Sequence, residues 1–255
     1  MIRRSTRLLE STLSCLFLGV VFSGSVLAQS GPSPSKSPFA SGASDPPVAT
    51  FSIVACDLER REWGVAVQSK ILAVGSLVPF AQAGAGAVAT QSFANTTFGP
   101  RGLKLLAAGS SAEDTVKQLI AADAGRRHRQ LAVIDAQGNV AHFTGDNCLD
   151  WAGAVSGRHY SCQGNILVGR GVVEAMAKAF ETKTGKLADR LTAALEAAQK
   201  AGGDKRGRQS AALLVVKKNA GYGGFNDRMI DLRVDDHKTP VVELKRLLDL
   251  RFGRK

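Results

Sequence analysis

Residues 50–57, TFSIVACD, form a run of apolar and β-branched residues that starts abruptly after a polar segment. Such a run predicts a buried β-strand. The segment LERRE at 58–62 follows and predicts a turn, and WGVAVQSK at 63–70 returns as a second strand. The sequence therefore predicts an antiparallel hairpin, in which the end of the second strand lies beside the beginning of the first.

The remaining chain alternates between groups of strands and groups of helices. In chain order we expect a Gly- and Ala-rich strand ending at 91, helices over 101–109 and 112–123, a hairpin over 129–145 that turns at 136–139, a strand over 159–169, helices over 171–183 and 186–202, strands over 210–218 and 229–236, and a helix over 241–250 that starts at Pro240. Gly99-Pro100 is expected to break the chain before the first helix, and Ser110 or Ser111 to cap the second. This order predicts the α+β class, with helices on the outer faces of antiparallel sheets. A four-layer αββα sandwich satisfies it.

The first 28 residues have the pattern of a secretory signal peptide. Arg3, Arg4 and Arg7 precede an apolar run over 13–26, and Val26-Leu27-Ala28 offers small or aliphatic residues to a signal peptidase before Gln29. A membrane anchor is the alternative, but the run is shorter than the ~20 residues that span a bilayer. We therefore expect an exported protein, periplasmic or secreted, with no stable membrane anchor after signal cleavage.

A flexible linker is expected between this signal peptide (1–28) and a single domain (50–255). Residues 29–49 are rich in Ser, Pro, Gly and Ala, and such a segment buries too little apolar area to offset its chain entropy. The formal charge of the whole chain is +11, and the part that follows the signal peptide keeps +9. Cations gather at 126–129, 205–208 and 245–255. No nucleic-acid motif accompanies them and aromatic residues are few, so we expect a solvated basic surface, with affinity for an anionic envelope surface as the alternative.

Three cysteines follow the signal peptide, Cys56, Cys148 and Cys162, so at most one internal disulfide can form. Cys56 falls inside a strand that reads as buried, which makes Cys148 and Cys162 the expected pair. There is no C-x-x-C pair or His cluster, and we expect neither a metal nor a cofactor.

Thr50 is the first candidate for chemistry, because it opens the first strand directly after the linker. A threonine hydroxyl becomes a useful nucleophile when a base takes its proton, and a free α-amino group on the same residue can be that base. The alternative is a β-branched residue that simply opens a strand. Ser69 and Lys70 close the second strand of the hairpin, so both are expected near Thr50, where a cation would lower the pKa of the threonine amine. The alternative is that Lys70 is a lysine that faces solvent at the end of a strand.

Several polar residues are candidates for substrate binding. Gln163 and Asn165 flank Gly164 in an otherwise apolar strand, and their amides could donate hydrogen bonds to an oxyanion or merely satisfy loop backbone. Asn95 offers similar donors on a loop, and Arg101 could hold a carboxylate.

Two further polar groups surround later strands. Asp204, Arg206, Arg208, Gln209 and Ser210 precede the strand at 210–218. Asp231, Arg233 and Asp235 alternate along the next strand and so share one face. Arg233 would compete with a metal for the two acids, so this face is expected to be an internal ion-pair network.

The ordered blocks TFSIVACD, WGVAVQSKILAVGSLVPFAQAGAGAVATQSFAN, FGPRGLKLLAAG, QGNILVG, GGDKRGRQSAALLVV and DLRVDDHKTPVVELKRLL resemble domain-of-unknown-function family 1028 over about residues 50–250. That family is placed in the N-terminal-nucleophile (Ntn) hydrolase superfamily, whose members share the αββα sandwich and hydrolyse amide bonds with an N-terminal Thr, Ser or Cys. Many relatives look as though they begin Met-Thr-Phe-Ser, and the matching threonine here is Thr50. This chain departs from that pattern, since 49 residues precede Thr50.

The resemblance implies an amidohydrolase that acts on a small amide or peptide substrate. Signal cleavage after Ala28 still leaves 21 residues before Thr50, so a second cut, at Ala49–Thr50, is required to free the amine. We expect a catalytic group of Thr50, Lys70 and Ser69, and a binding group of Asn95, Arg101, Gln163, Asn165, Asp204, Arg206 and Gln209. A non-catalytic αββα domain that binds an envelope ligand or partner is the alternative, and a homo-oligomer is left open.

Overall fold

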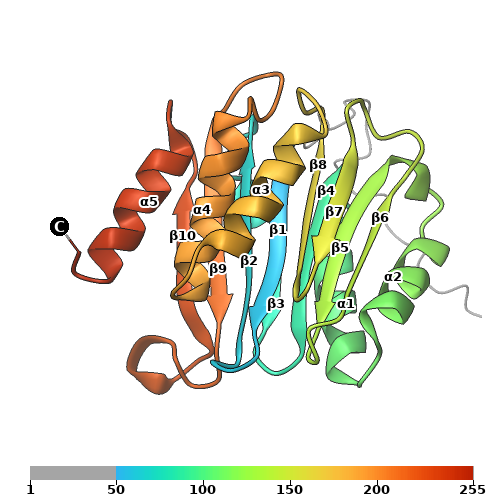
Figure 1. Cartoon of the computed structure of the whole chain (residues 1–255). Coiled ribbons are helices and arrows are strands. Elements are labelled where there is room, and N and C mark those ends of the chain that lie inside the picture. Colours follow the sequence, from blue (N-terminus) through green and yellow to red (C-terminus); the bar gives the residue numbers. More distant parts are fainter. Residues whose placement is uncertain (1–49, 255) are drawn as a thin grey trace, which may run out of the picture. The chain divides into compact units, whose positions relative to one another are not determined.

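The computed structural model describes residues 50–254, and the expectations for the signal peptide, the linker and their cleavage sites lie outside them. A six-stranded antiparallel sheet runs through the middle of this region, in the order β10-β9-β2-β1-β8-β7 (Figure 1). Its strands are β1 (Thr50–Asp57), β2 (Glu62–Ser69), β7 (Gly153–Gly157), β8 (Tyr160–Asn165), β9 (Ser210–Val216) and β10 (Arg228–Val234). The predicted hairpin is confirmed, and it is the centre of this sheet.

A second, four-stranded antiparallel sheet has the order β3-β4-β5-β6. Its strands are β3 (Pro79–Gln82), β4 (Gly86–Ser92), β5 (Arg129–Asp135) and β6 (Val140–Thr144). Residues on alternate positions of the two sheets meet in one apolar cluster, with Val54 and Val67 from the first sheet and Ala89 and Ala132 from the second. These side chains are shielded from water, so their burial holds the sheets together.

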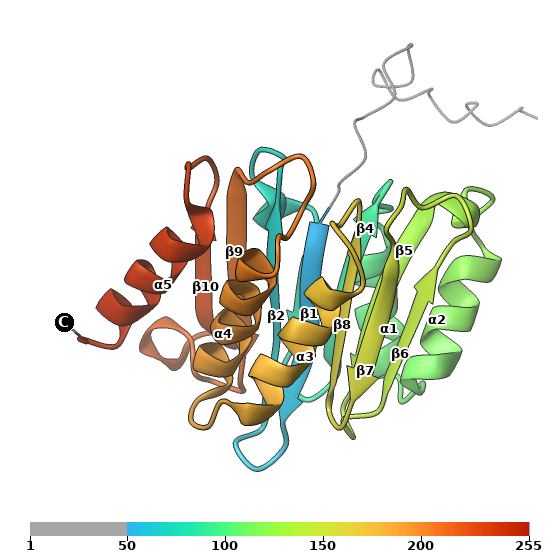
Figure 2. The ribbon, with the colours of Figure 1, turned by 45° about the horizontal axis from the view of Figure 1, so that its top comes forward.

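Helices cover the outer face of each sheet. Helices α3 (Gly171–Thr182), α4 (Leu187–Lys200) and α5 (Pro240–Arg251) pack their apolar sides on the six-stranded sheet, against Phe51 and Ile53 among others. Helices α1 (Phe98–Ala107) and α2 (Ala112–Ala121) pack on the four-stranded sheet, around Leu131 and Val133. Figure 2 shows α3 and α4 over β1 and β2, and α1 and α2 beside β5 and β6. Three short 3-10 turns complete the described elements: Val74–Ser76, Arg126–His128 and Tyr222–Gly224.

The α+β class, the two antiparallel sheets and the five helices agree with the sequence analysis. Ser111 caps α2, and its hydroxyl accepts the backbone N–H of Asp114. The role of Pro100 was wrong, because α1 begins at Phe98 and includes the proline in its first turn. A proline is tolerated there, since the first N–H groups of a helix have no partner within it. The short strands β3 and β7 were not predicted.

Two expected side-chain arrangements are corrected. The described cysteines are all free thiols. Cys162 packs with the helices on the outer face of the six-stranded sheet, whereas the Cys148 thiol donates to the Arg129 carbonyl of the other sheet, 3.3 Å away. The two therefore belong to different layers. The acids around Arg233 are exposed rather than internal, although Asp231 does accept an ion pair from Arg233 at 3.0 Å.

Candidate active site

A buried polar cluster lies between the sheets where β1 begins. In β1 and its two neighbours, Thr50 is the register partner of Ser69 and of Asn165. These side chains, with those of Ser52 and Gln163, occupy the alternate positions that face the second sheet. Gln91 and Gln130 meet them from that sheet. The hydroxyl–amide cluster is defined by these seven residues, each of them at most 1% exposed: Thr50, Ser52, Ser69, Gln91, Gln130, Gln163 and Asn165.

Thr50 is held on several sides within this cluster. Its hydroxyl donates to the Ser69 hydroxyl at 3.2 Å, and its carbonyl lies 3.5 Å from the Gln91 side-chain nitrogen. Gln91 in turn accepts a 2.6 Å hydrogen bond from the Ser52 hydroxyl and donates to Gln130 Oε1 at 2.7 Å. The nucleophile candidate is therefore fixed by side chains from both sheets.

Gln130 is the centre of the cluster. Its Oε1 accepts from Gln91 and, at 3.1 Å, from Asn165 Nδ2. Its Nε2 donates to the carbonyl of Gly164, the neighbour of Asn165, at 2.8 Å, and Asn165 is the register partner of Thr50 in β8. One side chain thus connects the four-stranded sheet to the strand beside Thr50.

Gln163 and Asn165, the two predicted oxyanion donors, both lie in this cluster, but each already donates hydrogen bonds to protein groups. Gln163 Nε2 donates to the Ala89 carbonyl at 3.1 Å and lies 3.4 Å from the Ser52 hydroxyl. Gln163 Oε1 is buried without a hydrogen-bond partner in the described region. Because Gln163 Nε2 has two N–H groups and two partners, an oxyanion role for Gln163 requires that one of these hydrogen bonds is exchanged, while Asn165 uses one N–H group on Gln130.

The functional groups of the seven side chains determine what chemistry the cluster can support. They are hydroxyls and carboxamides, and none of them titrates near neutral pH. A hydroxyl nucleophile needs a proton acceptor. None of these seven side chains is such a base, whereas a free α-amine on Thr50 would be one; a peptide nitrogen would not.

Ser69 is anchored by the polar residues that precede β9. The Ser69 carbonyl accepts the Gln209 backbone N–H at 3.0 Å, and Asp204 accepts the Lys70 backbone N–H at 3.2 Å. Asp204 is 3% exposed and pairs with the Arg206 guanidinium at 3.0 Å. These contacts fix the backbone at Ser69 and Lys70. The position of Ser69, and through it that of the Thr50 hydroxyl, therefore depends on Asp204, Arg206 and Gln209.

The Lys70 side chain is exposed and lines a shallow depression of about 540 Å³ rather than the buried cluster. Arg208, Lys238 and His237 line the same depression. Its one acid, Asp236, accepts a 3.1 Å hydrogen bond from Gln209. Lys70, Arg208 and Lys238 form no ion pair within residues 50–254, so the depression presents unneutralised positive charge next to Ser69.

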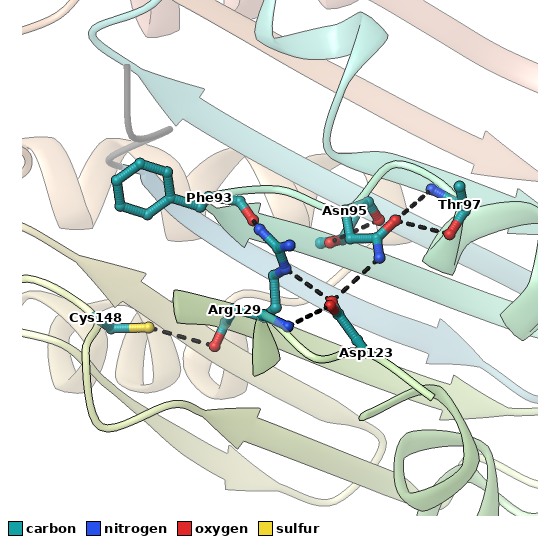
Figure 3. Close-up of polar contacts among 8 residues, drawn as sticks. Phe93, Asn95, Thr97, Asp123, Arg129 and Cys148 are labelled. Carbon is teal, nitrogen blue, oxygen red and sulfur yellow. Dashed lines mark hydrogen bonds and ion pairs between the residues drawn. The ribbon is translucent and has the colours of Figure 1, made fainter. Parts of the chain in front are cut away.

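Asn95 organises the loop after β4 rather than standing in the cluster (Figure 3). It donates to Asp123 at 3.1 Å and accepts the Thr97 backbone N–H at 3.1 Å, while Arg129 pairs with Asp123 at 2.8 Å. Burial alone would raise the pKa of Asp123, but hydrogen bonds from Arg129, Asn95 and Gly125 outweigh it and lower that pKa. Arg101 is exposed on α1.

The sequence analysis did not single out Ser52, Gln91 or Gln130. A signal for them was present. In GAGAVATQS and RQLAV, Gln91 and Gln130 occupy the same alternate positions as the small apolar residues Ala89 and Ala132, which indicates a buried face. No group of three or more His, Cys, Asp or Glu side chains in residues 50–254 is placed to hold a metal ion. Within that range there is also no helix with the length and apolarity to span a bilayer.

Fold and site together define an α+β domain with two antiparallel sheets and a buried hydroxyl–amide cluster at the start of its central strand. The model of the family of unknown function DUF1028 matches residues 50–244, and this chain belongs to that family. The match begins at Thr50.

Solved structures and curated proteins give the following comparison. The crystal structure of protein SPO2555 from Silicibacter pomeroyi, of the same family, is 36% identical, with a TM-score of 0.72 over 79% of this chain and 88% of that chain. Anbu, the ancestral beta-subunit from Yersinia bercovieri, is 13% identical with a TM-score of 0.35, over 80% of this chain and 98% of that one. No curated protein matches the chain.

Proposed function

We propose that this chain is an exported amidohydrolase that becomes active when the Ala49–Thr50 peptide bond is cut. The observation that carries the proposal is the hydroxyl–amide cluster, which holds the Thr50 hydroxyl among six other neutral side chains. A buried hydroxyl without a titratable neighbour in its own cluster is suited to one base, the α-amine of the same residue. We further propose that the domain is an αββα sandwich of the Ntn-hydrolase type, with the nucleophile between the two sheets.

The proposed reaction uses Thr50 as both nucleophile and base. The free amine takes the proton from Oγ1, and Oγ1 forms a bond to the substrate amide carbon. The resulting ammonium group returns the proton to the leaving amine as the C–N bond breaks, which leaves an ester on Thr50. A water molecule, deprotonated by the amine, then attacks the ester carbon, releases the carboxylic acid and restores Thr50.

The surroundings of the cluster suggest the substrate. The depression lined by Lys70, Arg208 and Lys238 starts one residue beyond Ser69 and would attract a negatively charged group. A small amide or peptide that carries a carboxylate fits this arrangement. Lys70 would then act on the substrate and, over a longer range, on the pKa of the Thr50 amine.

The experiment compares forms that differ only around Thr50. A fusion whose removal leaves Thr50 as the first residue is assayed against a panel of peptidyl and acyl aminocoumarin amides. Thr50→Ala should abolish hydrolysis while the fold, followed by circular dichroism, stays intact. Thr50→Ser should retain part of the activity, because it keeps both hydroxyl and amine. Thr182→Ala, an exposed threonine at the end of α3, serves as the control.

The pH dependence tests the base directly. If the amine is the base, activity rises with pH through a single ionisation near that of an α-amino group, about 7.7–8.0 when unperturbed. Full activity in a purified form that still carries Ala49 would contradict the proposal, because a peptide nitrogen takes no proton from the hydroxyl.

A binding role is the second candidate, favoured by the amides of the cluster. Gln163, Gln91 and Asn165 donate to groups within the cluster, so the donors are used for cohesion in the uncut chain. The domain would then bind an envelope ligand through its cationic depression without hydrolysing it.

Export itself is tested by mass spectrometry of the mature protein, for which we expect Gln29 as the first residue. Retention of Arg3 to Arg7 would contradict it.

A further inference from the structure

A second pocket lies at the end of the domain opposite Thr50. It has a volume of about 480 Å³ and is lined by the end of β1, the β1–β2 turn, the β7–β8 turn and the α3–α4 connection. Figure 2 shows the β1–β2 turn and the α3–α4 connection at one end of the fold and the start of β1 at the other. Since a strand rises ~3.3 Å per residue, the eight residues of β1 separate this pocket from Thr50 by about 23 Å. It is therefore a separate site.

Arg190 is the central cation of this pocket. Its guanidinium carbon stacks 4.0 Å from the centre of the Phe180 ring, and its Nε donates to the Phe180 carbonyl at 3.3 Å. Within the described region its two terminal nitrogens make no hydrogen bond or ion pair. The side chain is thus held rigidly by one edge, while the donors of the other edge stay available to a ligand.

The acids of the pocket do not neutralise Arg190. Asp57 accepts the backbone N–H and, at 2.7 Å, the guanidinium of Arg60. Glu181 accepts the Tyr160 hydroxyl at 2.7 Å. Burial lowers the pKa of Arg190 in spite of the attraction of Asp57. The guanidinium thus carries positive charge that its neighbours only partly offset.

Two more cations stand at the rim, Arg158 and Lys183, against one acid, Glu59. Arg158 is oriented by His159, whose backbone takes the left-handed conformation at φ 65°. His159 Nδ1 lies 3.0 Å from the Gly138 carbonyl, which requires a proton on Nδ1, and its Nε2 then accepts from Arg158 Nε at 3.3 Å. The Nε edge of the Arg158 guanidinium is fixed in this way, while its terminal nitrogens stay available to a ligand.

The pocket is suited to binding rather than to reaction at its thiol. Cys56 lies at its base, 2% exposed, and burial together with Asp135 and Asp57 raises the pKa of this thiol to about 12. A thiol with that pKa stays protonated at neutral pH and is a poor nucleophile.

We propose that this pocket binds a small ligand that carries an oxyanion, a carboxylate or a phosphate, through Arg190 with Arg158 and Lys183 at the rim. A guanidinium with two available terminal nitrogens offers the fork that such groups accept in bidentate fashion. The volume lies within the ~300–1,000 Å³ that is usual for small-molecule sites. This site stands independently of the proposed hydrolysis, because no residue of the hydroxyl–amide cluster lines it.

Calorimetric titration of the full chain at low ionic strength tests the site with two probes, inorganic phosphate and succinate. We expect saturable binding of at least one probe, and the stronger one identifies the oxyanion. Arg190→Gln should weaken that binding at least tenfold, and Arg190→Lys should restore only part of it, since an ammonium group lacks the fork. Arg246→Gln is the matched control, because Arg246 is already paired with Glu243 on α5.

Two outcomes would overturn the site: no saturable binding of either probe, or wild-type binding by folded Arg190→Gln. If Arg190→Gln does not fold, the double variant Arg158→Gln, Lys183→Gln takes its place. Both of its residues are exposed, so the fold should survive and binding should fall about threefold or more. Thr50→Ala should bind the probe like wild type, which separates this site from the proposed hydrolase.

Discussion

Thr50 and Asp57 lie at the two ends of the same strand, and the side chains around them differ in charge and in burial. Around Thr50 the side chains are neutral, almost completely buried and bonded to one another. Around Asp57 several side chains are charged, and Arg60 and Arg190 line a pocket there. A neutral, rigid cluster fixes the position of a reacting atom without adding charge, whereas an ionic pocket attracts a ligand over a distance. The comparison predicts that substitutions at the Thr50 end cost stability and those at the Asp57 end cost little.

The largest effect is expected for Gln130→Ala. This side chain hydrogen-bonds to Gln91, to Asn165 and to the Gly164 carbonyl, so its removal takes one hydrogen bond from each of these buried groups. The free energy of unfolding should fall by about 3 kcal/mol. Urea unfolding measures the loss, with Gln137→Ala, in an exposed turn, as the control. Equal stability of the two variants would show that the cluster does not hold the sheets together.

A smaller loss is expected for Arg129→Ala, in the network of Figure 3. The substitution leaves Asp123, whose side chain is 9% exposed, without its ion-pair partner. Because Arg129 is itself partly exposed, we expect about 2 kcal/mol, below the usual cost of breaking a fully buried pair. Arg127→Ala is the control, since that arginine lies 4.0 Å from an exposed acid. If both variants unfold at the same urea concentration, the network is not structural.

The sequence predicted one half of the Thr50 end and missed the other. Ser69 could be placed beside Thr50 because the pairing within a hairpin follows from the hydrophobic pattern and the turn position, whereas the pairing of Asn165 with Thr50 came from the structure. Gln91 and Gln130 belong to the second sheet. The sequence pattern within a strand does not show which residues of another sheet it will contact. The expected Cys148–Cys162 disulfide failed for the same reason: the two thiols belong to different layers.

The sequence pattern also failed to predict the short strands β3 and β7. Strand β7, GAVSG, has two glycines and a single β-branched residue, so its propensity for strand is weak, and its pairing with β8 is a tertiary effect. The proposed role of Thr50 as the reacting residue rests on its position after the linker and on the family resemblance, and the Thr50→Ala and Thr50→Ser variants test it.

At the Asp57 end, Glu62→Gln should stabilise the protein slightly at neutral pH. Glu62 is 5% exposed, its Oε2 has no hydrogen-bond partner among the described residues, and Lys217 is 3.9 Å away. Burial raises the pKa of Glu62, and Lys217 offsets this only in part. A carboxyl whose pKa is raised by folding contributes its stability below its unfolded pKa, about 4.3, and loses it as the pH rises through the folded pKa.

The glutamine variant is therefore expected to gain about 1 kcal/mol at pH 7 and nothing at pH 4 or below. Thermal unfolding over pH 3–8 measures the difference from wild type. Glu59→Gln, at an exposed position of the same turn, should follow wild type throughout. A gain that does not depend on pH would mean that the amide stabilises by packing and that the ionisation of Glu62 plays no part.

The smallest effect is expected for Arg233→Ala, away from both ends of β1. Arg233 pairs with Asp231 at 3.0 Å, and Arg228 pairs with the same acid at 2.6 Å, so Asp231 keeps a partner when Arg233 is removed. The Arg233 side chain is 40% exposed, and solvent-exposed pairs contribute little. The free energy of unfolding should change by less than about 0.5 kcal/mol. A loss of several kcal/mol would mean that the aliphatic part of Arg233, which lies over Gly75, holds the 3-10 turn on β10 through packing and not through charge. Arg233→Met, which keeps that apolar contact without the charge, would then restore the stability.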